Sequence, residues 1–185
     1  MNVKDYREEM ESLLKKYFSP EGYKITKAVE LDPVPENGKY EALIFSLNDR
    51  EIVYRKGNVT PDRPGAFLSV WQRPALDNGK GNKPIPLTPN ELDYLFVQVS
   101  SDSNNGMFIF PEAILEEKGI ITSATKKGKT GFRVFPPWSQ DRGVVGTKVF
   151  SESGKKTQRW QLPYFIQIGE DGYIDADKLK QIFSI

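Results

Sequence analysis

Basic and aromatic side chains alternate through one segment of the chain, from Thr122 to Trp160. The segment holds nine Lys and Arg residues against two acids, a local charge of +7, whereas the whole chain of 185 residues has a net charge of +1. Cations that hold phosphates and rings that stack on bases are the combination used to bind single-stranded nucleic acid. The residues that we predict for this role are Lys126, Lys127, Lys129, Arg133, Trp138, Arg142, Lys155, Lys156, Arg159 and Trp160.

Other interpretations of the same segment stay open. Tryptophan is buried in most globular domains, so Trp138 and Trp160 could belong to the core. The lysines could form an ordinary solvated surface, or a surface on which an acidic protein partner docks. The excess of nine cations over two acids favours a functional basic patch.

Gly128-Lys129-Thr130 matches only the end of a phosphate-binding loop. That motif needs a second glycine five positions before Gly128, where this chain has Ser123, and it must open a helix. The residues that follow, 132–135, are instead typical of a strand. The motif is therefore excluded, and we expect either a plain turn or a basic turn that presents N–H and ammonium groups to a phosphate.

Three acids are candidates for a second function, a nuclease that uses a divalent metal. Such a site needs two or three carboxylates and a lysine that meet at the ends of neighbouring strands. Asp62, Glu41 and Glu51 have suitable places in the sequence, but the strand predicted at residues 67–73 holds neither a carboxylate nor a lysine. The alternative is that Asp62 is a turn residue and that both glutamates are solvated strand positions.

The chain contains no histidine and no cysteine. These two absences exclude a Ser-His-Asp triad, a thiol nucleophile, a disulfide and a zinc site of Cys and His ligands. We expect no cofactor and no bound metal. Since no apolar run approaches the ~18 residues of a membrane span and the N-terminus is not a signal peptide, we expect a cytoplasmic protein without a membrane segment.

The patterns along the chain predict one α/β domain over residues 1–185. Apolar spacing and capping residues predict helices at 3–18, from Pro89, from Pro111 to Gly119, in the later part of 147–165 and at 175–183. Alternating or continuous apolar runs predict strands at 39–47, 51–55, 67–73, 95–99, 107–110 and 132–135. We expect one mixed sheet flanked by helices, in a strand order that the pattern does not give.

A series of short blocks resembles the MepB family of bacterial proteins. The blocks are FLSVWQR at 67–73, PIP at 84–86, GMFIFP at 106–111, LEEKGI at 115–120, GKTGFRVFP at 128–136 with Trp138, and KTQRWQ at 156–161 with Tyr164 and Phe165. Each block is short, but their order and spacing are specific. Together they cover residues 50–167 and leave out the two terminal helices.

The resemblance implies a fold related to the PD-(D/E)xK (restriction-type) endonucleases and nucleic-acid binding without an intact nuclease site. The predicted strand 67–73 agrees, because it lacks the acid and lysine of such a site. One departure is Gln72, where the family pattern leads us to expect a lysine. Arg73 is then the only cation of this strand, and we add it to the predicted nucleic-acid-binding residues.

Overall fold

A mixed six-stranded sheet forms the centre of the computed structural model, which describes residues 3–72, 85–140, 148–169 and 173–184. Its strands are β1 (Ile25–Leu31), β2 (Leu43–Leu47), β3 (Arg50–Lys56), β8 (Tyr94–Ser100), β9 (Asn105–Pro111) and β11 (Phe165–Gln167), paired in the order β1-β2-β3-β8-β9-β11. Only the β3–β8 pair is parallel among these strands, so the α/β architecture and the mixed sheet are as predicted.

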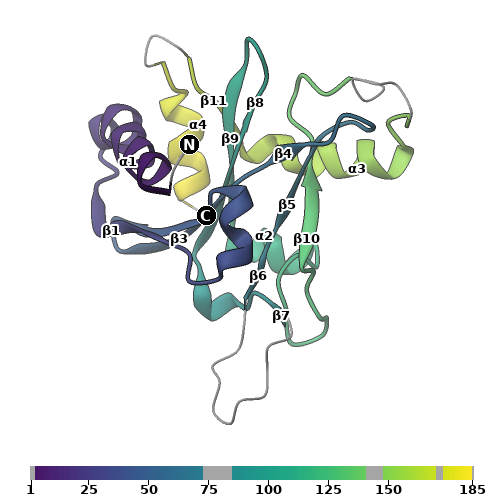
Figure 1. The fold of residues 1–185 in the computed structure, drawn as a ribbon, viewed down its shortest axis with the longest axis horizontal. Helices are drawn as coiled ribbons and strands as arrows, with labels where there is room; N and C mark the ends of the chain where they lie inside the picture. Colours follow the sequence, from purple (N-terminus) through teal and green to yellow (C-terminus); the bar gives the residue numbers. More distant parts are fainter. Residues whose placement is uncertain (1–2, 73–84, 141–147, 170–172, 185) are drawn as a thin grey trace.

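Helices from both ends of the chain cover one face of this sheet (Figure 1). The helix α1 (Val3–Leu13) continues through a π-helical turn (Leu14–Phe18) and a 3₁₀ turn (Ser19–Glu21), and α4 (Ala176–Phe183) lies beside it. Leu14, Phe18 and Leu179 are fully buried against strand residues such as Phe96. Both predicted terminal helices are confirmed, and Asp175 caps α4 by accepting a hydrogen bond from the Lys178 N–H at 3.1 Å.

A small sheet covers the opposite face. It consists of β10 (Gly131–Val134), β5 (Ala66–Ser69) and β4 (Asn58–Val59), and a separate ribbon pairs β6 (Trp71–Gln72) with β7 (Ile85–Pro86). Leu68 and Val134 point inward and bury against Val97 and Phe108 of the large sheet. Phe67 and Arg133 alternate with these inward residues, so they lie on the outer face of the small sheet.

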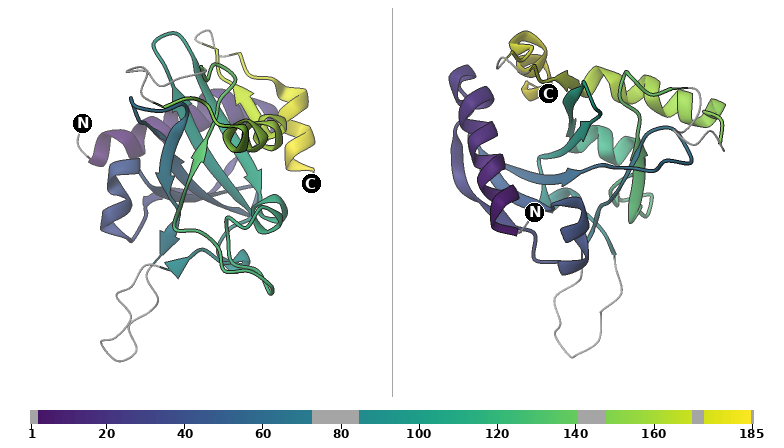
Figure 2. Two further views of the ribbon diagram at one scale, coloured as in Figure 1. Left: turned by 90° about the vertical axis from the view of Figure 1, so that its right-hand side faces the viewer. Right: turned by 45° about the horizontal axis from the view of Figure 1, so that its top comes forward.

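Two further helices flank the small sheet. The short α2 (Glu112–Glu117) follows β9, and Gly119 just after its C-cap Lys118 has φ +70°, as expected for a glycine after a helix C-terminus. The helix α3 (Glu152–Gln161) lies on the side of the molecule away from α1, as both views in Figure 2 show, and a 3₁₀ turn (Leu162–Tyr164) connects it to β11. None of the helices in the described ranges is long and apolar enough to cross a membrane.

A hydrogen-bond network around a buried arginine joins the two sheets. Arg55 of β3 is completely buried, and its Nη2 lies 3.0 Å from Asp32 Oδ2. Its Nε donates to the carbonyl of Ser69 in β5 at 3.0 Å. The Ser69 hydroxyl in turn donates to Asn37, whose side chain is also buried. This network fixes β5, and with it the small sheet, relative to β3.

Three details of the predicted elements are wrong. The strand expected from residue 39 begins only at Leu43, because Pro35–Tyr40 form a 3₁₀ helix that ends at Glu41 with φ +47°. The single strand expected at 67–73 is divided between β5 and β6, which pair with different partners. The pattern also missed β1, an edge strand with two irregular register shifts and one buried residue, Val29.

Candidate nucleic-acid interface

A groove of about 470 Å³ runs along the outer face of the small sheet, between α3 and the segment that joins α2 to β10. Three cations line it: Lys118, Lys129 and Arg133. No Asp or Glu is among the described residues of its wall. The remaining lining is aromatic, small or hydroxyl-bearing: Phe67, Ile120, Gly131, Phe132, Phe135, Ser151, Ser153, Gly154, Thr157 and Trp160. We call this hollow the cationic groove.

Backbone hydrogen bonds hold the loop that carries Lys129. The Lys129 N–H donates to the carbonyl of Ile120 at 2.8 Å, and the Gly128 N–H donates to Thr122 Oγ1 at 3.0 Å. A Cβ atom at Gly128 would lie 2.6 Å from the Ile121 backbone, so only glycine fits this close approach. Lys126 and Lys127 are exposed on the same loop but are not part of the groove wall. The predicted basic turn is therefore present, and it directs one of its three lysines into the groove.

Arg133 is a partly buried cation of β10. Its Nη2 donates to Thr60 Oγ1 at 2.5 Å and to the carbonyl of Pro64 at 2.7 Å. Burial is the main cause that lowers its pKa, and the nearby Arg63 lowers it further, but a guanidinium remains protonated at neutral pH. Arg133 thus supplies a positioned charge and also anchors the β4–β5 loop.

Trp160 and Lys118 form one end of the groove. The Trp160 ring packs on Phe110 with 5.6 Å between ring centroids, and the Lys118 Nζ lies 5.7 Å from the Trp160 centroid in a cation–π contact. Lys118 is absent from the residues predicted from the sequence, because the basic segment begins only at residue 122. The signal for it is its position just before Gly119, which marks it as a cation at the end of a helix.

None of the three cations of α3, Lys155, Lys156 and Arg159, lines the groove. Ser153, Thr157 and Trp160 lie on one face of the helix and line the groove. At 3.6 residues per turn, Lys155 and Arg159 lie on the opposite face, and Lys156 flanks the lining residues. Lys155 is also within 3.6 Å of Glu152. We expected the basic side chains to line one channel. In the described residues, only the three cations of the groove wall do so.

Trp138 lies in a different hollow, where its ring packs edge-on against Phe165 with centroids 5.6 Å apart. Trp138 and Trp160 are thus not neighbours along one wall, contrary to the prediction of a shared channel. Arg73 and Arg142 lie outside the described residues.

The acids considered for a metal site do not form one cluster in the described residues. Glu51 lies at the first end of β3 beside Lys27 at 3.9 Å, whereas Glu41 lies beside Lys56 at the last end, at 3.8 Å. Five residues of strand separate these ends, roughly 17 Å at ~3.3 Å per residue. Asp62 belongs to the β4–β5 loop. In the described part of the chain, no three acids form a group that could hold a metal ion.

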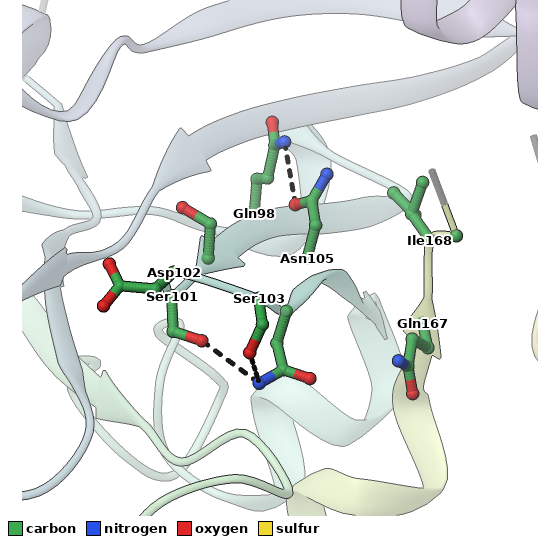
Figure 3. Close-up of a pocket in the computed structure, with 10 residues that line it drawn as sticks. Gln98, Ser101, Asp102, Ser103, Asn105, Gln167 and Ile168 are labelled. Atoms are coloured by element: carbon green, nitrogen blue, oxygen red, sulfur yellow. Dashed lines mark hydrogen bonds between the residues drawn. The ribbon is translucent and has the colours of Figure 1, made fainter. Parts of the chain in front are cut away.

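A polar hollow of about 760 Å³ opens at the tip of the β8–β9 hairpin, next to β11 (Figure 3). Its side chains bond mainly to one another: Gln98 Nε2 donates to Asn105 Oδ1 at 3.3 Å, and Asn104 Nδ2 donates to the Ser101 hydroxyl at 3.2 Å. Asp102 is the one charged residue among its described lining. With an acid, and without cations or rings, this hollow does not suit a phosphate backbone.

Comparison with known proteins agrees with the family resemblance. No curated protein sequence matches the chain. Among solved structures, one described as the crystal structure of MepB matches with a TM-score of 0.65 and 30% sequence identity, over 87% of this chain and 97% of that one. The family described as MepB-like matches residues 34–167, which include the small sheet, the cationic groove and every strand of the central sheet except β1, but neither terminal helix. On this match, the chain belongs to the MepB-like family.

Proposed function

We propose that the protein binds single-stranded nucleic acid through the cationic groove. The observation that carries the proposal is the convergence of Lys118, Lys129 and Arg133 beside Trp160, in a wall whose described residues include no acid. Cations that converge without acidic neighbours attract a polyanion, and an aromatic ring beside them adds affinity for bases.

The size of the groove favours single strands. A hollow of about 470 Å³ lies in the range of small-ligand sites, so individual nucleotides fit it and a duplex does not enter it. Phosphates would contact Lys129 and Arg133 along the outer face of β10. A base that stacks on Trp160 would replace the Lys118 ammonium over the ring, which would free Lys118 to pair with a phosphate.

The proposal also concerns the class of fold to which the mixed sheet belongs. We take the mixed sheet with flanking helices to be a restriction-endonuclease-like fold without its catalytic site. This view is supported by the separation of Glu41 from Glu51 at opposite ends of β3, and by the lack of any metal-holding group of three acids in the described residues. If labelled DNA or RNA were cleaved in the presence of Mg²⁺ or Mn²⁺, and Asp62→Asn abolished the cleavage, the nuclease alternative would replace it.

The test is fluorescence anisotropy with a labelled single-stranded oligonucleotide and its duplex form. We expect tighter binding of the single strand, and its loss in the double variant Lys118→Glu, Lys129→Glu. The matched control is Lys15→Glu, Lys24→Glu, which changes the net charge equally at exposed positions on the α1 side of the molecule. Equal loss in both double variants would refute the groove.

The same variants separate the protein-partner alternative. Purification of the protein from cells tests whether an acidic partner protein co-purifies with it. If that partner stays bound after nuclease treatment, and no longer co-purifies with the Lys118→Glu, Lys129→Glu variant, the groove binds the partner. If nuclease treatment removes everything that is bound, the nucleic-acid proposal gains support.

A further inference from the structure

A second hollow, of about 370 Å³, lies between the β4–β5 loop, the end of β8 and the segment that follows β10. We call it the Trp138 pocket. It shares no residue with the cationic groove among the described residues, yet one layer of chain separates the two. Arg133 of the groove donates to the carbonyl of Pro64, which lines the pocket, and a Cβ at Gly65 would lie 2.7 Å from the Phe135 ring of the groove wall.

The apolar part of the pocket suits a flat ring. Trp138 is half-buried, and its edge-on contact with Phe165 fixes the plane of the indole. Pro64, Pro136 and Val99 supply the neighbouring apolar surface. Val59, at the rim, is 57% exposed, which is unusual for valine and leaves apolar surface that a ligand would cover.

The polar part of the pocket suits the edge of a base and a phosphate. Hydroxyl groups of Ser100, Ser101 and Ser139 and the amide of Gln140 can both donate and accept, which matches the mixed edge of a nucleobase. The Ser139 hydroxyl oxygen is buried and has no hydrogen-bond partner among the described residues, which leaves a polar group for a ligand to satisfy. Arg63 is the one charged residue of the described lining. Its side chain is 40% exposed and its Nε lies 3.5 Å from Asp62 Oδ2, so a phosphate would bind through the rest of the guanidinium.

We infer that the Trp138 pocket binds one nucleotide unit, with its base against Trp138 and its phosphate on Arg63. The base comes either from a free nucleotide or from a strand that continues beyond the cationic groove, and only this second source rests on the function proposed above. The two sources share their chemistry, so the experiment must separate them.

The experiment is calorimetric titration of the whole protein with adenosine, adenosine 5′-monophosphate, uridine 5′-monophosphate and a short single-stranded oligonucleotide. Ribose 5-phosphate tests the phosphate alone, and benzoate tests an aromatic anion that is not a base. We expect Trp138→Leu to weaken nucleotide binding about tenfold or more. Arg63→Gln should weaken the monophosphates similarly and leave adenosine unchanged.

The probe whose affinity falls in Trp138→Leu shows whether the bound base comes from a free nucleotide or from a strand. If the monophosphates bind at one site and bind more weakly to Trp138→Leu, the pocket binds a free nucleotide. A loss confined to the oligonucleotide identifies a base of a bound strand. Either result supports the pocket. No effect of Trp138→Leu on any probe, or binding of benzoate or ribose 5-phosphate as tight as that of the nucleotides, would overturn it.

Groove variants distinguish this inference from the proposed function. If Lys118→Gln with Lys129→Gln abolishes oligonucleotide binding but spares the monophosphates, both sites stand as separate. If those variants have no effect and Trp138→Leu does, the groove fails and the pocket stands. Circular dichroism checks folding, and Arg63→Gln, at an exposed side chain, keeps the test valid if Trp138→Leu does not fold.

Discussion

The salt dependence of strand binding measures how many groove cations contact phosphate. Each phosphate neutralised on a single strand contributes about 0.7 to the slope of log affinity against log salt. Lys118, Lys129 and Arg133 line the groove, so the expected slope is about −2.1 for full contact by all three. Affinity should then fall roughly 18-fold between about 50 and about 200 mM salt.

Removing one contact should lower that slope by a fixed amount. In Lys129→Gln we expect a slope of about −1.4, so that the affinity falls roughly sevenfold over the same salt range. Lys15→Gln has the same net charge, but its lysine lies in the π-helical turn on the other side of the central sheet, so its slope should equal that of the unchanged protein. Anisotropy titrations at four or more salt concentrations give both slopes. An unchanged slope in Lys129→Gln, or equal changes in both variants, would show that the groove does not hold the phosphates.

Three further predictions concern residues that support the site. Asp32→Asn should lower the free energy of chemical unfolding by about 3 kcal/mol, because it leaves the guanidinium of Arg55 buried without its carboxylate. The double variant Asp32→Asn, Arg55→Met should recover part of that free energy. A hydrogen bond with Glu116 and partial burial raise the pKa of Glu112 to about 7, so the folded state binds this proton more tightly than the unfolded state. The unfolding temperature should therefore fall as pH rises from about 4.5 through about 7. In Glu112→Gln, the unfolding temperature should depend less on pH over this range. Gly128→Ala, which forces a Cβ against the Ile121 backbone, should weaken strand binding with no change in charge, and unchanged affinity would show that the loop conformation does not matter.

Local signals predicted those elements that neighbouring residues determine. The hairpin of β2 and β3 follows from apolar strands around Asn48 and Asp49, which both take positive φ and so form its tight turn. The capping box of Thr88 and Glu91 is present as expected, with the Thr88 N–H donating to the Glu91 carboxylate at 2.6 Å. In each case the hydrogen-bond partner lies within a few residues, where a sequence pattern can indicate it.

Distant partners decided the elements that the pattern missed. The run from Phe67 shows no local sign of ending, but the Val70 N–H donates to the carbonyl of Thr130 and the chain then leaves β10 to pair with β7. In β1, only Val29 is buried, so no alternation of apolar residues indicates a strand. The site was predicted in part for the same reason: residue types identified Lys129, Arg133 and Trp160, but only the packing of α2 against β9 brings Lys118 to them.

The layered fold explains why both hollows flank the small sheet. Helices α1 and α4 bury one face of the six-stranded sheet, and β5, β10 and α2 bury the other, so its open hollow lies at the tip of the β8–β9 hairpin and not on either face. The small sheet has a single covered face, and its outer residues, such as Phe67 and Arg133, remain accessible beside α3. The basic segment 122–160 supplies β10 and α3, so the cations of these two elements lie on this side of the molecule, away from α1 (Figure 2). On the function proposed above, this is the surface to which a polyanion would be attracted.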